Sequence, residues 1–328
     1  MEEENNILRE TVAEFCEKNL DEKIIETEGI SKKLIDLIAS QGFLGSSIPD
    51  KYSGSGLDKI SYEIILEEIS KYSPSVAMKI FLLNSLYYPS VKDTPAENTL
   101  TDASTGKIST AVDFINKQVN VRTSAGKMTG EIKNILGSDC DQLIVFHGGT
   151  STVSGPFRSE SRDFMGFRGL KFGDLSLDNS FQNLNSENKL PEIMEKSYGP
   201  ASAIALGMIS GALQKAIDYT NVRKAFGNQL RDFEPVSFRL ARFRSTETIL
   251  RNVLYSKTDP YYTFNFAMEH LVEIARYSVN THGGYGYFKD FGVEKFYRDA
   301  IVMKSIFYGT DQLRKLTEHV YTEKINFV

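Results

Sequence analysis

The segment IVMKSIFYGTDQL runs from Ile301 to Leu313, and its apolar stretch stops at Tyr308, directly before Gly309 and Thr310. Glycine adopts backbone conformations that other residues avoid, so this pair indicates a helix end where the backbone approaches something closely. A tyrosine hydroxyl can donate a proton or a hydrogen bond. With an ordinary pKa of about 10, however, it is a poor base at neutral pH. The question that this segment raises is what chemistry Tyr308 can do.

A second segment that could bind a ligand is RKAFGNQLRDF, from Arg223 to Phe233, which follows a long predicted helix. Arg223 at the helix end can hold a phosphate, while the ring of Phe226 covers a flat heterocycle. The same residues also fit an ordinary helix C-terminus, where basic side chains meet the negative end of the helix dipole. Spacing alone leaves both interpretations open.

A third segment, HGGYGYFKDFGVEKFYRD, contains four glycines separated by aromatic residues, beginning with Gly283 and Gly284. Glycines let a backbone approach a ligand, and successive amides can cradle a pyrophosphate. The segment lacks the Gly-Lys-Ser/Thr of a phosphate-binding P-loop, and no strand precedes it as a dinucleotide-binding fingerprint requires. A tight turn between helices explains the glycines equally well.

Composition narrows the class of protein. The chain has 328 residues, a net charge of -5 and no block of lysine and arginine, which argues against nucleic-acid binding. Cys16, Cys140 and four scattered histidines provide neither a disulfide framework nor a metal site. The acidic MEEENN start predicts no signal peptide, and the longest apolar stretch is too short to span a bilayer. We therefore expect no membrane span and a cytoplasmic protein.

Three regions must position these segments, and together they predict a multidomain α+β fold. Residues 1–106 read as an N-terminal helical domain, including one long helix from Ile60 to Lys79. Residues 107–189 contain short β-type runs such as ISTAVDF, VNVRT and QLIVFH between glycine-rich breaks, and predict a middle β domain. Residues 190–328 return to long amphipathic helices and predict a C-terminal helical bundle.

Three motifs, in their order and separation along the chain, resemble those of the acyl-CoA dehydrogenase family. They are GFLGSSIPDKYSGSGLDKISYEIILEEISKYSPSVAMKI, RKAFGNQLRDFEPVSFRLARF and HGGYGYFKDFGVEKFYRDA with its following GT. The usual family patterns are approximately P-x-x-Y-G-G-x-G early, R-x-x-F-G in the bundle and G-G-x-G-Y…R-D-A…E-G-T late. The resemblance covers both helical regions and is weak across the β region.

The resemblance implies a flavoprotein that oxidises the Cα–Cβ bond of an acyl-CoA thioester. In the family, FAD accepts the hydride and passes electrons to an electron-transfer flavoprotein. Arg223 and Phe226 then match the residues that reach the FAD of a neighbouring subunit. Gly283 and Gly284 match the Gly-Gly pair, and Thr310 matches a flavin-side contact, with Gln312 two residues further on. Family members are commonly tetramers, so a homotetramer or a hetero-oligomer with a paralogue is expected.

The usual catalytic glutamate is not found. Tyr308 occupies the place before Gly-Thr where many members carry this base. A minority carry it 26 residues before the arginine, where this chain has Ser197. Glu195 is two residues away, a helical rotation of about 200°, so it should face elsewhere. Asp311 is the other weak candidate.

Several further departures are visible. The family's T-E-P…G-S-D loop has no clear counterpart around STAVDFINKQVNV, and IKNILGSDCDQLIVF replaces the usual aromatic strand beside the flavin. Glu234 stands where the bundle motif has glutamine, and the chain is short between Leu83 and Ala111.

Three hypotheses remain: a fatty-acid-metabolising acyl-CoA dehydrogenase with an unusual base or substrate, a non-catalytic subunit that lends Arg223 and Phe226 to a complete paralogue, or a flavin monooxygenase of the same fold.

Overall fold

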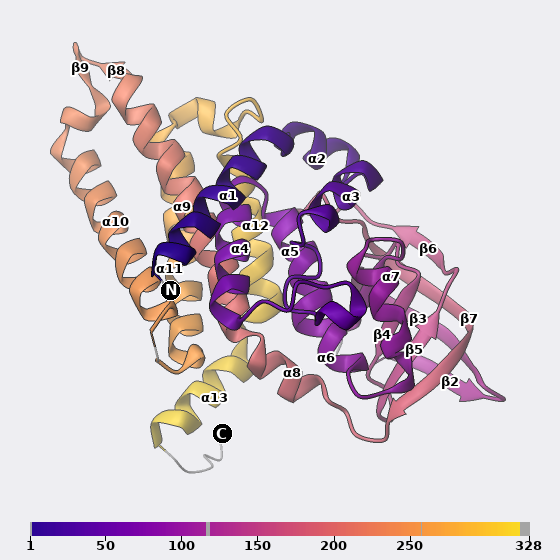
Figure 1. Cartoon of the computed structure of the whole chain (residues 1–328). Helices are drawn as coiled ribbons and strands as arrows, with labels where there is room; N and C mark the ends of the chain where they lie inside the picture. Colours follow the sequence, from indigo (N-terminus) through magenta and orange to yellow (C-terminus); the bar gives the residue numbers. More distant parts are fainter. Residues whose placement is uncertain (1, 116–118, 257, 322–328) are drawn as a thin grey trace.

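The computed structural model describes residues 2–115, 119–256 and 258–321. Within these ranges, helices form the N-terminal and C-terminal regions and a β-sheet lies between them in sequence, as the predicted fold class requires. In Figure 1 the sheet occupies one side, the C-terminal helices the other, and the N-terminal helices lie across the middle. None of the helices in these three ranges is long and apolar enough to cross a membrane.

The N-terminal helices are delimited by short polar caps. Ser31 caps α3 by accepting a hydrogen bond from the Leu34 amide, and Asp58 does the same for α4 from Ser61. The elements of this region are α1 (Glu2–Asn19), α2 (Glu22–Glu28), α3 (Lys32–Ser40), η1 (Asp50–Tyr52), α4 (Lys59–Tyr72), α5 (Pro74–Phe81), η2 (Leu82–Tyr87), α6 (Tyr88–Val91), η3 (Pro95–Thr99) and α7 (Leu100–Ser104).

The single helix expected from Ile60 to Lys79 is wrong, because the chain breaks at Ser73. Pro74 cannot donate an amide hydrogen bond, and the residue before a proline is pushed into an extended conformation. Ser73 accordingly has φ -137° and ψ 97°, and its hydroxyl accepts a hydrogen bond from the Val76 amide. The result is two helices, α4 and α5, instead of one.

The sheet has the strand order β1-β4-β5-β7-β3-β2, with β6 paired to β7. Only β1 and β4 pair in parallel, and the remaining pairs are antiparallel. Met128, Ile132, Leu143 and Val153 are among the residues that fill a separate small core within this sheet. The strands are β1 (Thr110–Val112), β2 (Asn120–Ser124), β3 (Lys127–Leu136), β4 (Gln142–Val145), β5 (Thr150–Ser154), β6 (Arg158–Ser161) and β7 (Phe172–Asn185).

The C-terminal bundle is built around α9, which is buried on nearly every side. Leu206, Ile209 and Leu213 of this helix are completely buried, and they belong to one core that extends through both helical regions. The elements are α8 (Leu190–Lys196), α9 (Tyr198–Val222), β8 (Lys224–Ala225), β9 (Asn228–Gln229), η4 (Leu230–Asp232), α10 (Glu234–Leu254), α11 (Pro260–Thr281), η5 (Gly283–Tyr287), α12 (Glu294–Phe307) and α13 (Thr310–Tyr321).

Candidate functional site

Arg223 and Phe226 lie on a hairpin, β8–β9, that projects from the end of the bundle (Figure 1). Phe226 and Gly227, the two loop residues, have φ of 52° and 88°, as a tight two-residue hairpin turn requires. The turn leaves the Phe226 ring 96% exposed. An aromatic ring held outward on a strained turn, beside an exposed arginine, is suited to contact another molecule.

Gly283 and Gly284 begin η5, next to the hairpin, and the Arg223 guanidinium lies 5.8 Å from the centre of the Tyr285 ring. Gly283 has φ of 58°, and a Cβ added to either glycine would meet no atom within 4 Å. The backbone of these two glycines is therefore open to a ligand. We call the exposed surface formed by Arg223, Phe226, Gly283, Gly284 and Tyr285 the hairpin end of the bundle.

Tyr308 lies at the opposite end of the bundle, directly after α12. Its hydroxyl donates a hydrogen bond of 2.7 Å to Oε1 of Glu269 on α11, and the Lys304 ammonium lies 5.3 Å from its ring centre. Burial, followed by the hydrogen bond and charge of Glu269, raises the pKa of Tyr308 above its ordinary value. The side chain is therefore protonated at neutral pH, and no motif in the sequence pointed to Glu269.

Gln312 is held by two buried tyrosines that the sequence analysis did not single out. Tyr198 donates to Oε1 of Gln312 at 2.7 Å, and the Tyr261 hydroxyl donates to its backbone carbonyl. Burial raises the pKa of both tyrosines, and the charge of Glu195 adds to this increase. The backbone of α13 begins at Thr310, but the side chains of Thr310 and Asp311 lie outside those that the structure describes.

Glu195 itself is exposed on α8, whereas Ser197, at the minority position of the family's base, is buried and donates to the Met194 carbonyl. In the part of the chain that the structure describes, the Tyr308 hydroxyl donates to Glu269 and not to Glu195. We call the group of Glu195, Tyr308 and Gln312 the tyrosine end of the bundle.

The two ends are separated by the full length of α9. Tyr198 begins this helix and touches Gln312, whereas Arg223 caps its other terminus. At 1.5 Å per residue, the 25 residues of α9 span roughly 37 Å. The structure therefore places Arg223 beside Tyr285 of η5 and holds the hairpin and the two glycines at the end of the bundle far from Tyr308 and Gln312 of the same chain.

The end of α12 also carries an aromatic contact with the β region. Phe307 is buried, its ring stacked against Phe114 beyond β1 and edge-on to Phe81 of α5, each at 5.5 Å. Phe114 belongs to the segment without a counterpart of the family's flavin loop, and residues 116–118 of that segment lie outside the described residues. Phe307 thus faces inward, and Tyr308, the next residue, reaches Glu269.

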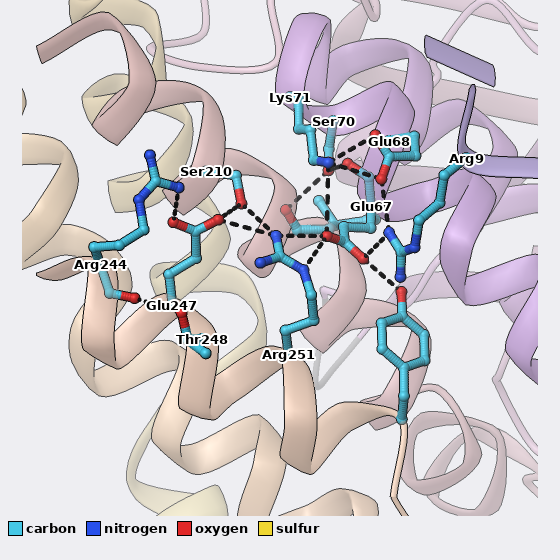
Figure 2. A network of polar contacts seen from close by, with 12 residues as sticks. Arg9, Glu67, Glu68, Ser70, Lys71, Ser210, Arg244, Glu247, Thr248 and Arg251 are labelled. Carbon is cyan, nitrogen blue, oxygen red and sulfur yellow. Dashed lines mark hydrogen bonds and ion pairs between the residues drawn. The ribbon is translucent and has the colours of Figure 1, made fainter. Parts of the chain in front are cut away.

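A network of charged side chains occupies a third location, between α1, α4, α9 and α10 (Figure 2). Glu67 is fully buried and receives hydrogen bonds from Arg9, Arg251 and Tyr255, with distances of 2.6 to 2.9 Å. Burial alone would raise the pKa of Glu67, but Arg251, Lys71 and Arg9 outweigh it and the pKa is lowered. These contacts, with the hydrogen bond from Arg9 to Glu68, give the Glu67–Glu68 pair a structural role.

The network continues to Glu247, which accepts from Ser210, Arg244 and Arg251. Several of its members line a cavity of about 1360 Å³ between α1–α2 and α9–α10. Among the described residues, none of those that define the hairpin end or the tyrosine end lines this cavity. Phe291, in the loop after η5, does line it. Its size alone does not make it the reaction site.

Comparisons with known proteins agree with this architecture. Residues 2–94 match the family described as "Acyl-CoA dehydrogenase, N-terminal domain", and residues 200–259 and 264–318 match "Acyl-CoA dehydrogenase, C-terminal domain". These matches cover more than half of the chain. The chain therefore belongs to the acyl-CoA dehydrogenase family. Like the members of that family, it is an oxidoreductase that uses FAD.

Individual relatives are distant in sequence but cover at least 96% of the chain. The "Caffeyl-CoA reductase-Etf complex subunit CarC" of Acetobacterium woodii is 26% identical, with 96% of this chain and 97% of the relative covered. The "3-(aryl)acrylate reductase" of Clostridium sporogenes is 25% identical, with the same coverages. The structure of butyryl-CoA dehydrogenase from Megasphaera elsdenii shares the fold, with a TM-score of 0.83, 23% identity, and 97% and 98% of the two chains covered.

The residues of the hairpin end fit part of an FAD molecule. Arg223 supplies an exposed cation for a phosphate, Phe226 an exposed ring for a heterocycle, and Gly283 and Gly284 an open backbone. Because the tyrosine end is roughly 37 Å away along α9, one cofactor cannot use both ends of the same chain.

Proposed function

We propose that this protein oxidises the Cα–Cβ bond of an acyl-CoA thioester. The proposal rests on one observation. A single bundle, whose sequence matches the family, carries the hairpin end, which suits a cofactor, and the tyrosine end, which suits a substrate. FAD, when bound, accepts the hydride that leaves Cβ. Tyr308 stands in the place of the family's base, with Gly309 beside it open to a ligand, because an added Cβ would meet no atom within 4 Å.

We further propose that the functional unit contains at least two chains. The length of α9 supports this, because Arg223 and Phe226 of one chain can reach a cofactor near Tyr308 only if that cofactor belongs to a second chain. A homotetramer, or a hetero-oligomer with a paralogue, satisfies this requirement. The Phe226 ring, which the described residues leave almost fully exposed, is consistent with such an interface.

An electron-transfer flavoprotein is the proposed electron partner. A relative from Acetobacterium woodii is named as a subunit of a reductase complex with "Etf". We also propose a role in fatty acid metabolism, a cytoplasmic location and domain boundaries after residues 106 and 189. The boundaries are supported by β1 and α8, which begin at Thr110 and Leu190, and the location by Cys16 and Cys140, which are free and buried.

The reverse reaction, reduction of an α,β-unsaturated acyl thioester, is a second candidate. It is favoured by the raised pKa of Tyr308, since a protonated tyrosine suits the delivery of a proton to Cα better than its removal. Two relatives are named as reductases, which is consistent with this direction.

One titration separates the two directions. The FAD-loaded protein is mixed without oxygen with butyryl-CoA, octanoyl-CoA and 3-phenylpropionyl-CoA, and the flavin absorbance is recorded. Dehydrogenation predicts bleaching by at least one of them. Reduction predicts that the chemically reduced protein is reoxidised by the matching unsaturated thioester. A flavin that responds to neither series would contradict both proposals.

A further inference from the structure

Tyr308 connects the interior of the bundle with its surface. The Tyr308 side chain is half-buried. Its hydroxyl donates a hydrogen bond of 2.7 Å to Oε1 of Glu269, which is exposed on α11. Glu269 lies on α11 and Tyr308 directly follows α12, 39 positions along the chain, so the contact depends on the packing of α12 against α11. One hydrogen bond therefore leads from a half-buried hydroxyl to a carboxylate in contact with solvent.

The surroundings of this hydroxyl leave room for a ligand beside it, and they keep the phenol protonated. Gly309 follows directly, and the space where its side chain would be is open within 4 Å. The Lys304 ammonium lies over the Tyr308 ring, 5.3 Å from its centre. Tyr261 lies close enough that ionisation of one of these two tyrosines opposes ionisation of the other.

Tyr308 alone is a poor base. Burial and the neighbouring carboxylate disfavour its ionised form, so a reaction that first had to make a tyrosinate would be slow. Moving both protons together removes this difficulty, because the phenol oxygen then gains one proton as it releases the other.

Building on the proposed function, we propose that Tyr308 and Glu269 form a proton relay between the acyl thioester and solvent. In dehydrogenation the Cα–H bond breaks and its proton binds the Tyr308 oxygen. The hydroxyl proton of Tyr308 passes to Oε1 of Glu269, and the electron pair of the Cα–H bond enters the new double bond as the hydride leaves Cβ. In reduction every transfer runs in reverse. Tyr308 is the catalytic residue, and Glu269 is a positioning residue that acts through it.

The test uses exchange of the α-proton, which reports the relay separately from hydride transfer. The FAD-loaded full chain is incubated in D2O, without oxygen, with butyryl-CoA, octanoyl-CoA and 3-phenylpropionyl-CoA. Deuterium at Cα is then measured by mass spectrometry. Glu273→Gln is the matched control, since Glu273 is a carboxylate one turn further along α11 that pairs with Arg239 at 2.8 Å. FAD content, measured by absorbance, must be equal in all variants.

The relay predicts that Tyr308→Phe slows exchange by about 100-fold or more, the scale of a lost acid–base group. We expect Glu269→Gln to slow it at least about 10-fold, Glu269→Asp to restore part of the rate, and Glu273→Gln to match the wild type. Exchange in Glu269→Gln at the wild-type rate would overturn the relay, and if acyl-CoA still bleached the flavin the proposed function would stand. A wild-type protein that is neither bleached nor active in exchange would overturn both.

Discussion

Arg251 on α10 holds Glu67 on α4 by two hydrogen bonds to the same carboxylate oxygen, from Nε at 2.9 Å and Nη2 at 2.8 Å. Figure 2 shows this pair at the centre of the network that joins the N-terminal helices to the bundle. Arg9 on α1 reaches the other oxygen of Glu67. The contact therefore ties three helices, distant in sequence, at one fully buried carboxylate.

We expect Glu67→Gln to destabilise the protein by about 3–5 kcal/mol, because removing one partner of a buried ion pair leaves the other charge uncompensated. Urea unfolding followed by circular dichroism measures the change. Glu192→Gln is the control, since Glu192 pairs with Lys196 on the exposed face of α8 and should leave the unfolding midpoint unchanged. Equal midpoints for Glu67→Gln and wild type would show that the network does not stabilise the fold.

Asp299 gives the stability of the protein a pH dependence. It is fully buried, and burial, with the charge of Glu26, raises its pKa to about 7, while the amide of Phe167 donates to it at 2.5 Å and opposes the rise. Its ordinary pKa is about 3.9, so between pH 4 and 7 the folded state binds more protons than the unfolded state. The free energy of unfolding therefore falls as the pH rises through this window.

Asp299→Asn should remove this contribution, since an asparagine oxygen can still accept from Phe167. We expect the variant to gain stability relative to wild type on going from pH 5 to pH 8, by up to a few kcal/mol. Thermal or urea unfolding at both values measures the difference. Glu22 and Glu26 on α2 and Arg298 on α12 remain in both proteins, so their titration largely cancels in the comparison. A stability difference that is the same at both pH values would contradict the assignment.

Arg223→Ala should lower the retention of FAD about 10-fold or more, because a charge-assisted contact to a phosphate is lost. Arg223 is exposed on the hairpin end, so the melting temperature of the cofactor-free protein should not change. Lys224→Ala, the adjacent exposed cation, is the control and should keep FAD as the wild type does. Equal losses in both variants would indicate a general charge effect instead of a phosphate contact.

Gly284 and Gly286 make a matched pair within η5. A Cβ at Gly284 meets no atom within 4 Å, whereas one at Gly286 would lie 2.3 Å from the Val279 carbonyl oxygen. Gly284→Ala should therefore fold with wild-type stability but retain less FAD, since the methyl group enters the open space beside the backbone. Gly286→Ala should instead lower the melting temperature of the cofactor-free protein. Full FAD retention by Gly284→Ala would remove this glycine from the proposed cofactor contact.

The regular elements of the fold could be predicted because local signals agree with the final packing. The long amphipathic helices predicted for residues 190–328 are present, and the turn predicted at Gly283 and Gly284 follows α11 as η5. The break at Ser73 was missed because the helical periodicity runs through it, although Pro74 was the available signal.

The contacts of the candidate site were less accessible to sequence. Tyr308 was marked by its place before Gly309, but Glu269, Tyr198 and Tyr261 come from other helices, and no spacing rule brings them to α12 or α13. The separation of the two ends also needed the structure, because it depends on α9 running uninterrupted from one to the other.

The most direct test of the account is the visible absorption spectrum of the protein purified alone, after FAD is added and the excess is removed by gel filtration. Its elution volume gives the oligomeric state in the same run. We predict about one FAD per chain in a dimer or larger assembly, and loss of most of that FAD in Arg223→Ala. A colourless wild-type protein, or a monomer that keeps FAD in full, would contradict the claim that one chain completes the cofactor site of another.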